Sequence, residues 1–191
     1  MYNKYEVLIN KENMIDENFY KQYELIEVLN IDGEKIKIEK TTYKNYLALK
    51  NELLEKENIE LGILNSFRDF KEQEEICKEY AQIYGVDLAY KLAAIPGASE
   101  HHSGLAIDIT LKRDDGSFAE TNDELYEVDN KFLIVHKYLS KYGFILRYLK
   151  DKTEITEYNY EPWHIRYIGE NIATICFNEK ISLEEYYKKY I

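Results

Sequence analysis

Short β-prone runs and amphipathic helical stretches follow one another irregularly along this chain, without the strict strand-helix-strand order of a parallel sheet. Asp32-Gly33 lies between two β-prone runs in IEVLNIDGEKIKIEK, a pattern typical of a tight hairpin turn. Further strands are expected in YEVLIN, LGILNS, the second half of ASEHHSGLAIDIT, FILRY and EPWHIRYIG. This order predicts an α+β fold with a central, mainly antiparallel sheet flanked by helices.

Helical periodicity predicts helices between these runs. From Thr42 to Glu57, apolar residues recur at helical spacing behind a threonine that can cap the first turn. A second helix is expected from Phe70 to Tyr84, with Gly85 as its C-terminal stop. Further helices are expected over 87–94, over 131–142 and after the capping box of Ser182 and Glu185. The polar, acidic stretch from Leu111 to Asn130 is expected to be a surface loop.

The size and charge of the chain limit its organisation and its partners. Its 191 residues fit one domain, expected to span residues 1–191. The formal net charge of −11 would repel phosphates and anionic lipid, so neither a nucleic acid nor a membrane is expected as a partner. No run reaches the roughly 18 apolar residues of a spanning helix, and charges interrupt the N-terminal segment, unlike a signal peptide. A cytoplasmic location is therefore expected, while the sequence gives no indication of the oligomeric state.

The densest group of chemically active side chains is SEHHSGLAID, at an expected junction between a loop and a strand. A hydrolytic zinc site needs three protein ligands and an open position for water. His101 and Asp108 are candidates for two of these ligands, because a turn through Gly104 can bring both side chains to one point. The alternative is an exposed loop histidine and a solvated aspartate.

A second group, EPWHIRY, can supply the missing parts of such a site. His164 is a candidate third ligand. Alternate residues of a strand share a face, so Glu161 must reach the site from the loop before the strand, where Pro162 permits a bend. A carboxylate beside zinc that is not a ligand can accept a proton from water, which is the chemistry of peptide hydrolysis. The alternative is core packing by Trp163 beside a hydrogen-bonded histidine.

Two further residues need an interpretation. Arg68 is expected where a strand passes into a helix, as a fixed cation for a substrate carboxylate or for a developing oxyanion. An ordinary ion pair with Asp69 or Glu72 is the alternative. His136 lies on an expected amphipathic helix without a second ligand at helical spacing, which favours a packed or surface histidine.

Together these segments match the motifs of a known family. SEHHSGLAID fits the pattern Ser-x-His-x-x-Gly-x-Ala-x-Asp, and EPWHIRY fits Glu-x-x-His with flanking Pro-Trp and Arg-Tyr. NSFRDFKEQ resembles a Tyr-Arg-Ser-x-x-x-Gln segment, and all three occur in the same order. The chain therefore resembles the zinc D-alanyl-D-alanine carboxypeptidases and dipeptidases of the VanY, VanX and VanXY type over most of its length.

The resemblance implies a fold, a metal and a set of residue roles. The fold is that of the D,D-peptidases and the hedgehog signalling domain. One zinc ion per chain is implied, with residue roles as follows: metal ligands His101, Asp108 and His164, catalytic base Glu161, transition-state stabilisation by Arg68, and binding of the substrate's terminal carboxylate or amide by Ser99 and Gln73. The chain departs from the family by having Phe67-Arg68-Asp69 in place of Tyr-Arg-Ser, so the acidic Asp69 is expected to alter carboxylate binding.

The resemblance also implies substrates, which are small peptides ending in D-Ala-D-Ala. We expect a dual enzyme that releases D-Ala from the dipeptide and from peptidoglycan precursor pentapeptides, with the segment Leu111 to Asn130 bordering the site. An L,D-carboxypeptidase or a peptidoglycan endopeptidase with the same zinc site is an alternative. A zinc-stabilised binding module without turnover is another.

Overall fold

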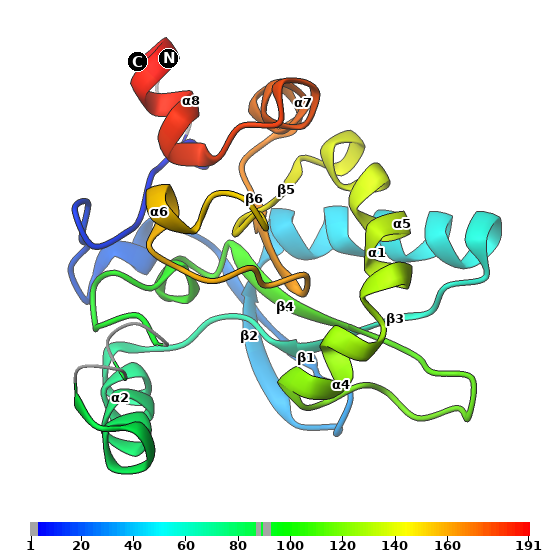
Figure 1. The fold of residues 1–191 in the computed structure, drawn as a ribbon, viewed down its shortest axis with the longest axis horizontal. Coiled ribbons are helices and arrows are strands. Elements are labelled where there is room, and N and C mark those ends of the chain that lie inside the picture. Colours follow the sequence, from blue (N-terminus) through cyan, green and yellow to red (C-terminus); the bar gives the residue numbers. More distant parts are fainter. Residues whose placement is uncertain (1–3, 87–88, 90–92) are drawn as a thin grey trace.

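The computed structural model describes residues 4–86, 89 and 93–191, and its centre is an antiparallel sheet (Figure 1). The sheet has the strand order β3-β4-β6-β5, with bounds β3 Leu61–Asn65, β4 Ala106–Leu111, β6 His164–Tyr167 and β5 Phe144–Leu146. Each neighbouring pair in this order is antiparallel. The expected α+β fold with a mainly antiparallel sheet is confirmed.

A separate hairpin is formed by β1 (Leu25–Leu29) and β2 (Lys35–Glu39), as the Asp-Gly pair predicts. Gly33 in its turn has a φ of 79°, a conformation that glycine adopts without steric cost. The side chain of Asn30 accepts hydrogen bonds from the backbone N–H groups of Asp32 and Glu34 and closes the turn.

One face of the sheet carries the main hydrophobic core. Ile107, Ile109 and Leu111 alternate along β4 and are fully buried there. Helices α1 (Lys40–Glu57) and α5 (Asp129–Leu139) contribute side chains to this core and pack against each other (Figure 1). The opposite face of the sheet is therefore left for the polar residues of β4 and β6.

The remaining helices surround the sheet. Their bounds are η1 Phe19–Gln22, α2 Phe70–Tyr84, η2 Glu100–Ser103, α4 Asn122–Glu127, η3 Ser140–Tyr142, α6 Thr153–Thr156, α7 Glu170–Glu179 and α8 Leu183–Tyr190. Helix α2 ends at Gly85, and α8 begins with the capping box of Ser182 and Glu185, both as expected. A second, smaller core around Ile145 and Ile172 packs α7 and α8 behind β5.

Two expectations for the first part of the chain are wrong. YEVLIN (5–10) is not a strand, because the carbonyl groups of Tyr5 and Val7 accept hydrogen bonds from Arg166 instead of a neighbouring strand. Helix α1 begins at Lys40, before the expected threonine cap. Glu39 caps it, because its carboxylate accepts from the backbone N–H of Thr42 at 2.7 Å.

Two other expectations concern the middle of the chain. The stretch Leu111 to Asn130 is not simply a surface loop, because it contains α4, which begins with a capping box of Thr121 and Glu124. Leu125 of α4 is buried and holds the segment against the core. Most of the helix expected over 87–94 lies outside the described residues.

Within the described ranges, no helix combines the length and the apolar character needed to cross a membrane.

Candidate active site

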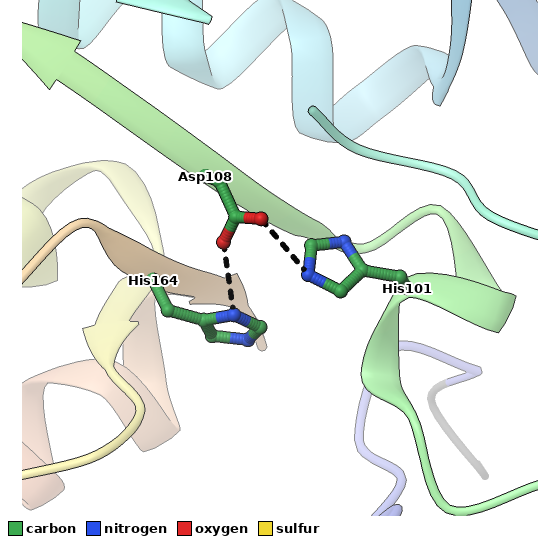
Figure 2. A group of neighbouring side chains, drawn as sticks. All are labelled: His101, Asp108 and His164. Carbon is green, nitrogen blue, oxygen red and sulfur yellow. Dashed lines mark hydrogen bonds and ion pairs between the residues drawn. The ribbon is translucent and has the colours of Figure 1, made fainter. Parts of the chain in front are cut away.

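Strand alternation places two of the expected metal ligands side by side. Asp108 points away from the core side of β4, because Ile107 and Ile109 on either side of it are buried in the core. Asp108 is paired with His164 of β6 in the antiparallel register, so the two side chains leave the sheet on the same face. Figure 2 shows the two side chains meeting there.

His101 reaches the same point from η2, the short helix before β4 (Figure 2). Gly104 ends η2 with a φ of 73°, in the left-handed region. A Cβ atom at Gly104 would lie 2.7 Å from Leu25 Cδ2, so the packing also favours glycine. The expected glycine turn between His101 and Asp108 is therefore confirmed.

The three residues form a compact set of donor atoms. His101 Nε2 lies 3.3 Å from Asp108 Oδ2, and His164 Nδ1 lies 3.1 Å from Asp108 Oδ1. One donor atom from each residue can be chosen so that all lie within 4.8 Å of one another. Ligand atoms of a tetrahedral zinc site are about 3.4 Å apart, because zinc bonds to nitrogen and oxygen are about 2.0–2.2 Å long. The donor types and their spacing therefore fit zinc.

A hydrogen bond behind His101 fixes its tautomer. Its Nδ1 atom lies 2.6 Å from the carbonyl oxygen of Ser66, and a carbonyl can only accept, so Nδ1 carries the hydrogen. The Nε2 lone pair of His101 then faces Asp108 and is available to a metal.

Burial and charge together set the protonation of the donor set in the metal-free protein. Burial opposes ionisation of Asp108, but the two histidines outweigh it and hold the pKa of Asp108 well below its usual range. Burial lowers the pKa of His101, which favours the neutral imidazole that metals bind. Burial opposes protonation of His164 as well, but its contacts with Asp108 and Glu100 raise the pKa of His164 to about 9.

Glu161 lies beside the donor set in the loop before β6. Its Oε2 atom is 3.8 Å from His164 Nδ1, and a quarter of its side chain (25%) is exposed. Burial of the carboxyl group, with repulsion by Asp108, raises the pKa of Glu161 to about 7. A carboxylate with a pKa near neutrality next to metal ligands has the properties of a general base.

Arg68 lies in the segment between β3 and α2 and is fixed at both its ends. Its Nη1 group donates to Gln73 Oε1 at 2.9 Å. Its backbone N–H donates to the His101 carbonyl at 3.2 Å, and its carbonyl accepts from His102 Nδ1 at 2.7 Å. The ligand-bearing turn η2 therefore also holds the backbone of the arginine.

The alternative ion pair of Arg68 with a neighbouring acid is wrong. Asp69 is the N-cap of α2 and accepts from the backbone N–H of Glu72 at 2.8 Å, while Glu72 accepts from that of Asp69 at 2.7 Å. Asp69 is exposed, and its carboxylate faces the first turn of α2. The departure from the family pattern at this position therefore serves to cap the helix.

Ser99 and Gln73 are both buried, with 3% and 1% of their surface exposed. Gln73 holds Arg68 through Oε1, and its Nε2 donates to the Ala94 carbonyl at 2.6 Å. The side chain of Ser99 makes no capping bond to η2.

All seven residues expected from the sequence line one cavity of about 370 Å³, a size suited to a small ligand. Further side chains of this lining are Ile76, Tyr80, Asn122, Tyr148, Tyr158 and Trp163. Asn122 belongs to α4, so the segment 111–130 borders the cavity as expected. His136 lies outside it, on α5, with Nε2 at 2.9 Å from the Pro162 carbonyl, as a packed histidine.

Sequence reasoning missed Glu100, which lies between Ser99 and His101 and is 1% exposed. Its Oε2 atom is 3.5 Å from His164 Nε2, on the other side of the imidazole ring from Asp108. The sequence contained one signal, because alternation places Arg166 on the same strand face as His164. A buried arginine requires a carboxylate partner, but the sequence does not show which one.

Comparison with known proteins gives one family for the chain. Residues 35–170 match the family described as VanY, D-alanyl-D-alanine carboxypeptidase. The chain is 34% identical to YodJ of Bacillus subtilis, over 95% of this chain and 66% of YodJ. It is 36% identical to the bifunctional D-Ala-D-Ala dipeptidase and carboxypeptidase VanXYC of Enterococcus gallinarum, over 67% of this chain and 66% of VanXYC. The chain thus spans just under two thirds of the length of each relative.

Solved structures give the same fold. The LdcB LD-carboxypeptidase has a TM-score of 0.83 and 32% identity, over 95% of this chain and 85% of that chain. VanYB in complex with D-Ala-D-Ala has a TM-score of 0.79 and 28% identity, over 99% of this chain and 100% of that chain. A VanY variant in complex with Zn(II) has a TM-score of 0.77 and 28% identity, over 96% of this chain and 99% of that chain.

Proposed function

Because the chain belongs to the VanY family of D-alanyl-D-alanine carboxypeptidases, we propose that it is a zinc peptidase that releases D-Ala from D-Ala-D-Ala and from precursor pentapeptides. The observation that carries the proposal is the donor set of His101, Asp108 and His164 with Glu161 beside it, in one cavity with Arg68. Metal-assisted hydrolysis of a peptide bond uses elements of this kind: a metal site, a base for the attacking water and a fixed cation for the developing oxyanion. The similarity to the bifunctional VanXYC supports the dual activity. That residues 1–191 form one such domain remains a prediction.

In this proposal one zinc ion per chain is held by His101, Asp108 and His164. When bound, zinc supplies a water of lowered pKa and polarises the scissile carbonyl group. Two of its ligands are neutral imidazoles and one is a carboxylate, a combination that leaves a fourth position for water.

The proposed role of Glu161 is proton transfer. Its carboxylate accepts the proton of the attacking water as the new bond from oxygen to carbon forms. It then gives this proton to the nitrogen of the departing D-Ala as the bond from carbon to nitrogen breaks. Glu161 suits both steps because a carboxylate beside the metal site can accept the proton of the water and then donate it to the leaving nitrogen.

The proposed role of Arg68 is to stabilise the negative charge that develops on the carbonyl oxygen, and Gln73 keeps its guanidinium in place. Ser99, with its hydroxyl in the same cavity, is proposed to bind the terminal carboxylate or the amide of the substrate. The aromatic side chains Tyr148, Tyr158 and Trp163 form apolar walls that suit the methyl groups of D-Ala.

A second candidate is L,D-carboxypeptidase activity. The similarity to the LdcB LD-carboxypeptidase favours it, with a TM-score of 0.83. In that case the same residues would remove D-Ala from a tetrapeptide stem.

Product analysis on three substrates tests the proposal: D-Ala-D-Ala, a pentapeptide ending in it, and a tetrapeptide whose last bond joins an L-centre to D-Ala. If the protein has both proposed activities, it should release D-Ala from D-Ala-D-Ala and from the pentapeptide at rates far above that from the tetrapeptide. Release of D-Ala from the tetrapeptide alone would show that the protein is an L,D-carboxypeptidase instead. No release from any of them by the zinc-loaded protein would leave a peptidoglycan endopeptidase or a binding module. The cytoplasmic location remains a sequence-based prediction, which cell fractionation tests.

A further inference from the structure

Behind His164, on the side away from Asp108, lies the carboxylate of Glu100. Glu100 Oε2 and His164 Nε2 are 3.5 Å apart, and both side chains are at least 95% buried. Within the described part of the chain, neither of these two atoms has a hydrogen-bond partner, and each is the other's neighbour at ion-pair distance. A buried polar atom without a partner is costly, so the two atoms are placed to satisfy each other.

The other oxygen of Glu100 is held by two buried arginines. Oε1 accepts from Arg147 Nε at 2.8 Å and from Arg166 Nη1 at 2.7 Å. Glu184 of α8 accepts from both terminal nitrogens of Arg147, at 2.9 and 2.6 Å. We call Glu100, Arg147, Arg166 and Glu184 the arginine cluster. Its two positive and two negative charges balance.

The remaining donors of the arginine cluster bind the N-terminal segment. Arg166 Nη2 donates to the Tyr5 carbonyl at 3.2 Å and to the Val7 carbonyl at 2.8 Å. Arg147 Nη2 lies 3.5 Å from the Ile9 carbonyl. Segments from both ends of the described chain therefore hold the two arginines, and through them Glu100, in one orientation.

We propose that Glu100 is a positioning residue for the metal ligand His164. It accepts the hydrogen of His164 Nε2, which directs the Nδ1 lone pair toward Asp108 and the metal. This inference rests on the proposed zinc function. A carboxylate behind a metal-binding histidine fixes the tautomer and the ring orientation and strengthens the ligand.

The partners of the two carboxylate oxygens of Glu100 distinguish this role from an ordinary buried ion pair. An arginine that pairs with a carboxylate for stability alone commonly uses both oxygens in a fork. Here both arginine bonds go to Oε1, and Oε2 is left for the imidazole. The turn η2 thus supplies one ligand, His101, and the residue that supports another, so a single local structure sets two of the three metal ligands.

The test uses Glu100→Gln, with Glu184→Gln as the matched control. Both variants remove one carboxylate charge from the arginine cluster, but only Glu100 faces His164. We expect Glu100→Gln to bind zinc 10–100-fold more weakly in competition with a chelator. Glu184→Gln should bind zinc within about twofold of the wild type, although both variants lose stability.

A proton spectrum of the zinc-loaded protein gives a second readout that does not depend on activity. The Nε2–H resonance of His164 should lie far downfield in the wild type, because it is bonded to a carboxylate, and should move upfield in Glu100→Gln. The Nδ1–H resonance of His101, bonded to the Ser66 carbonyl, should stay in place as an internal reference.

If Glu100→Gln does not fold, Glu100→Asp keeps the charge for the arginines with a shorter side chain and should show the same loss of affinity. Zinc affinity within twofold of the wild type, in whichever folded variant is measured, overturns the inference. Such a result would leave the proposed function intact, because that depends on His164→Ala losing zinc and on peptide cleavage by the wild type.

Discussion

Two groups of buried charged residues meet at His164, which belongs to one of them and contacts Glu100 of the other, and the two groups are built differently. The arginine cluster is enclosed, its charges balance, and its two ion pairs with Arg147 have distances of 2.8 and 2.6 Å. The site cluster of His101, Asp108, His164 and Glu161 opens into the cavity and combines two carboxylates with two imidazoles. Complete pairing avoids the cost of an unpaired buried charge, whereas a group of converging donors without a central partner is suited to bind a cation.

The contrast between the two clusters would be wrong if the site cluster did not hold a metal. His164→Ala removes one of three donors, so zinc affinity should fall more than about 100-fold and turnover should be lost with the metal. Metal analysis after dialysis measures this. Zinc at one equivalent per chain in His164→Ala would contradict the ligand assignment. His136→Ala is the control, because His136 lies on α5 outside the cavity.

A second change separates metal binding from chemistry within the site cluster. Glu161→Gln should keep zinc and lose about 10²–10⁴-fold in turnover, because the proton acceptor is removed and the ligands stay. The thermal stability of the zinc-free variant should not fall, since burial disfavours the charge of Glu161 in the folded metal-free protein. Turnover near the wild-type rate in Glu161→Gln would show that another group is the base.

Arg68 is a cation in the lining of the cavity into which the site cluster opens. Arg68→Ala should lower kcat about 10²–10³-fold if the guanidinium stabilises the oxyanion. Arg113→Ala is a matched control, because Arg113 pairs with Glu124 at 3.1 Å outside the cavity lining. A higher KM with unchanged kcat would make Arg68 a binder of the substrate carboxylate instead.

A substitution in the arginine cluster should change the stability of the fold. Glu184→Gln removes one partner of a buried arginine and should lower the free energy of unfolding by about 3 kcal/mol. Denaturant unfolding of the zinc-loaded protein measures the loss, and kcat of the folded variant should change little. A loss below about 1 kcal/mol would mean that Arg147 finds other acceptors.

Each of the two motifs of the site cluster could be predicted from the sequence because its information is local, and the resemblance to a known family joined the two motifs. The alternation of β6 put His164 on one face and Glu161 in the preceding loop, and the Gly104 turn joined His101 to Asp108. Patterns of this kind depend on residues within a few positions of one another, as does the Asp-Gly turn of the β1–β2 hairpin.

The arginine cluster was beyond sequence reasoning because its members come from four distant segments. Glu100, Arg147, Arg166 and Glu184 meet only after η2, β5, β6 and α8 have packed. The same cluster explains why the strand predicted over 5–10 does not form, because Arg166 donates to the carbonyl groups that a neighbouring strand would have bonded. Local β-propensity was overruled by a tertiary interaction.

A third cluster consists of Glu52 and its partners Lys141, Lys56 and Tyr142, and changes in it should have the smallest effect on stability. Glu52 accepts from Lys141 at 2.8 Å, from Lys56 at 2.5 Å and from Tyr142 at 2.5 Å. Hydrogen bonds from Lys141, then Lys56 and Tyr142, lower the pKa of Glu52 from 4.5 to about 2. A lowered carboxyl pKa contributes stability that is present above pH 4.5 and is lost as the pH falls toward 2.

Glu52→Gln should therefore lower Tm by a few degrees at most at pH 7, and the difference from the wild type should shrink as the pH is lowered to 3. Thermal unfolding of both proteins across this range measures the difference. Glu27→Gln is the control, because Glu27 pairs with the exposed Lys35 at 3.3 Å. High salt should reduce the effect of Glu52→Gln, since its partners Lys56 and Lys141 are exposed and their charges are screened, and should leave the larger loss in Glu184→Gln nearly unchanged. A difference between Glu52→Gln and the wild type that is constant from pH 7 to pH 3 would mean that the contacts of Glu52 act through packing and that its charge contributes nothing.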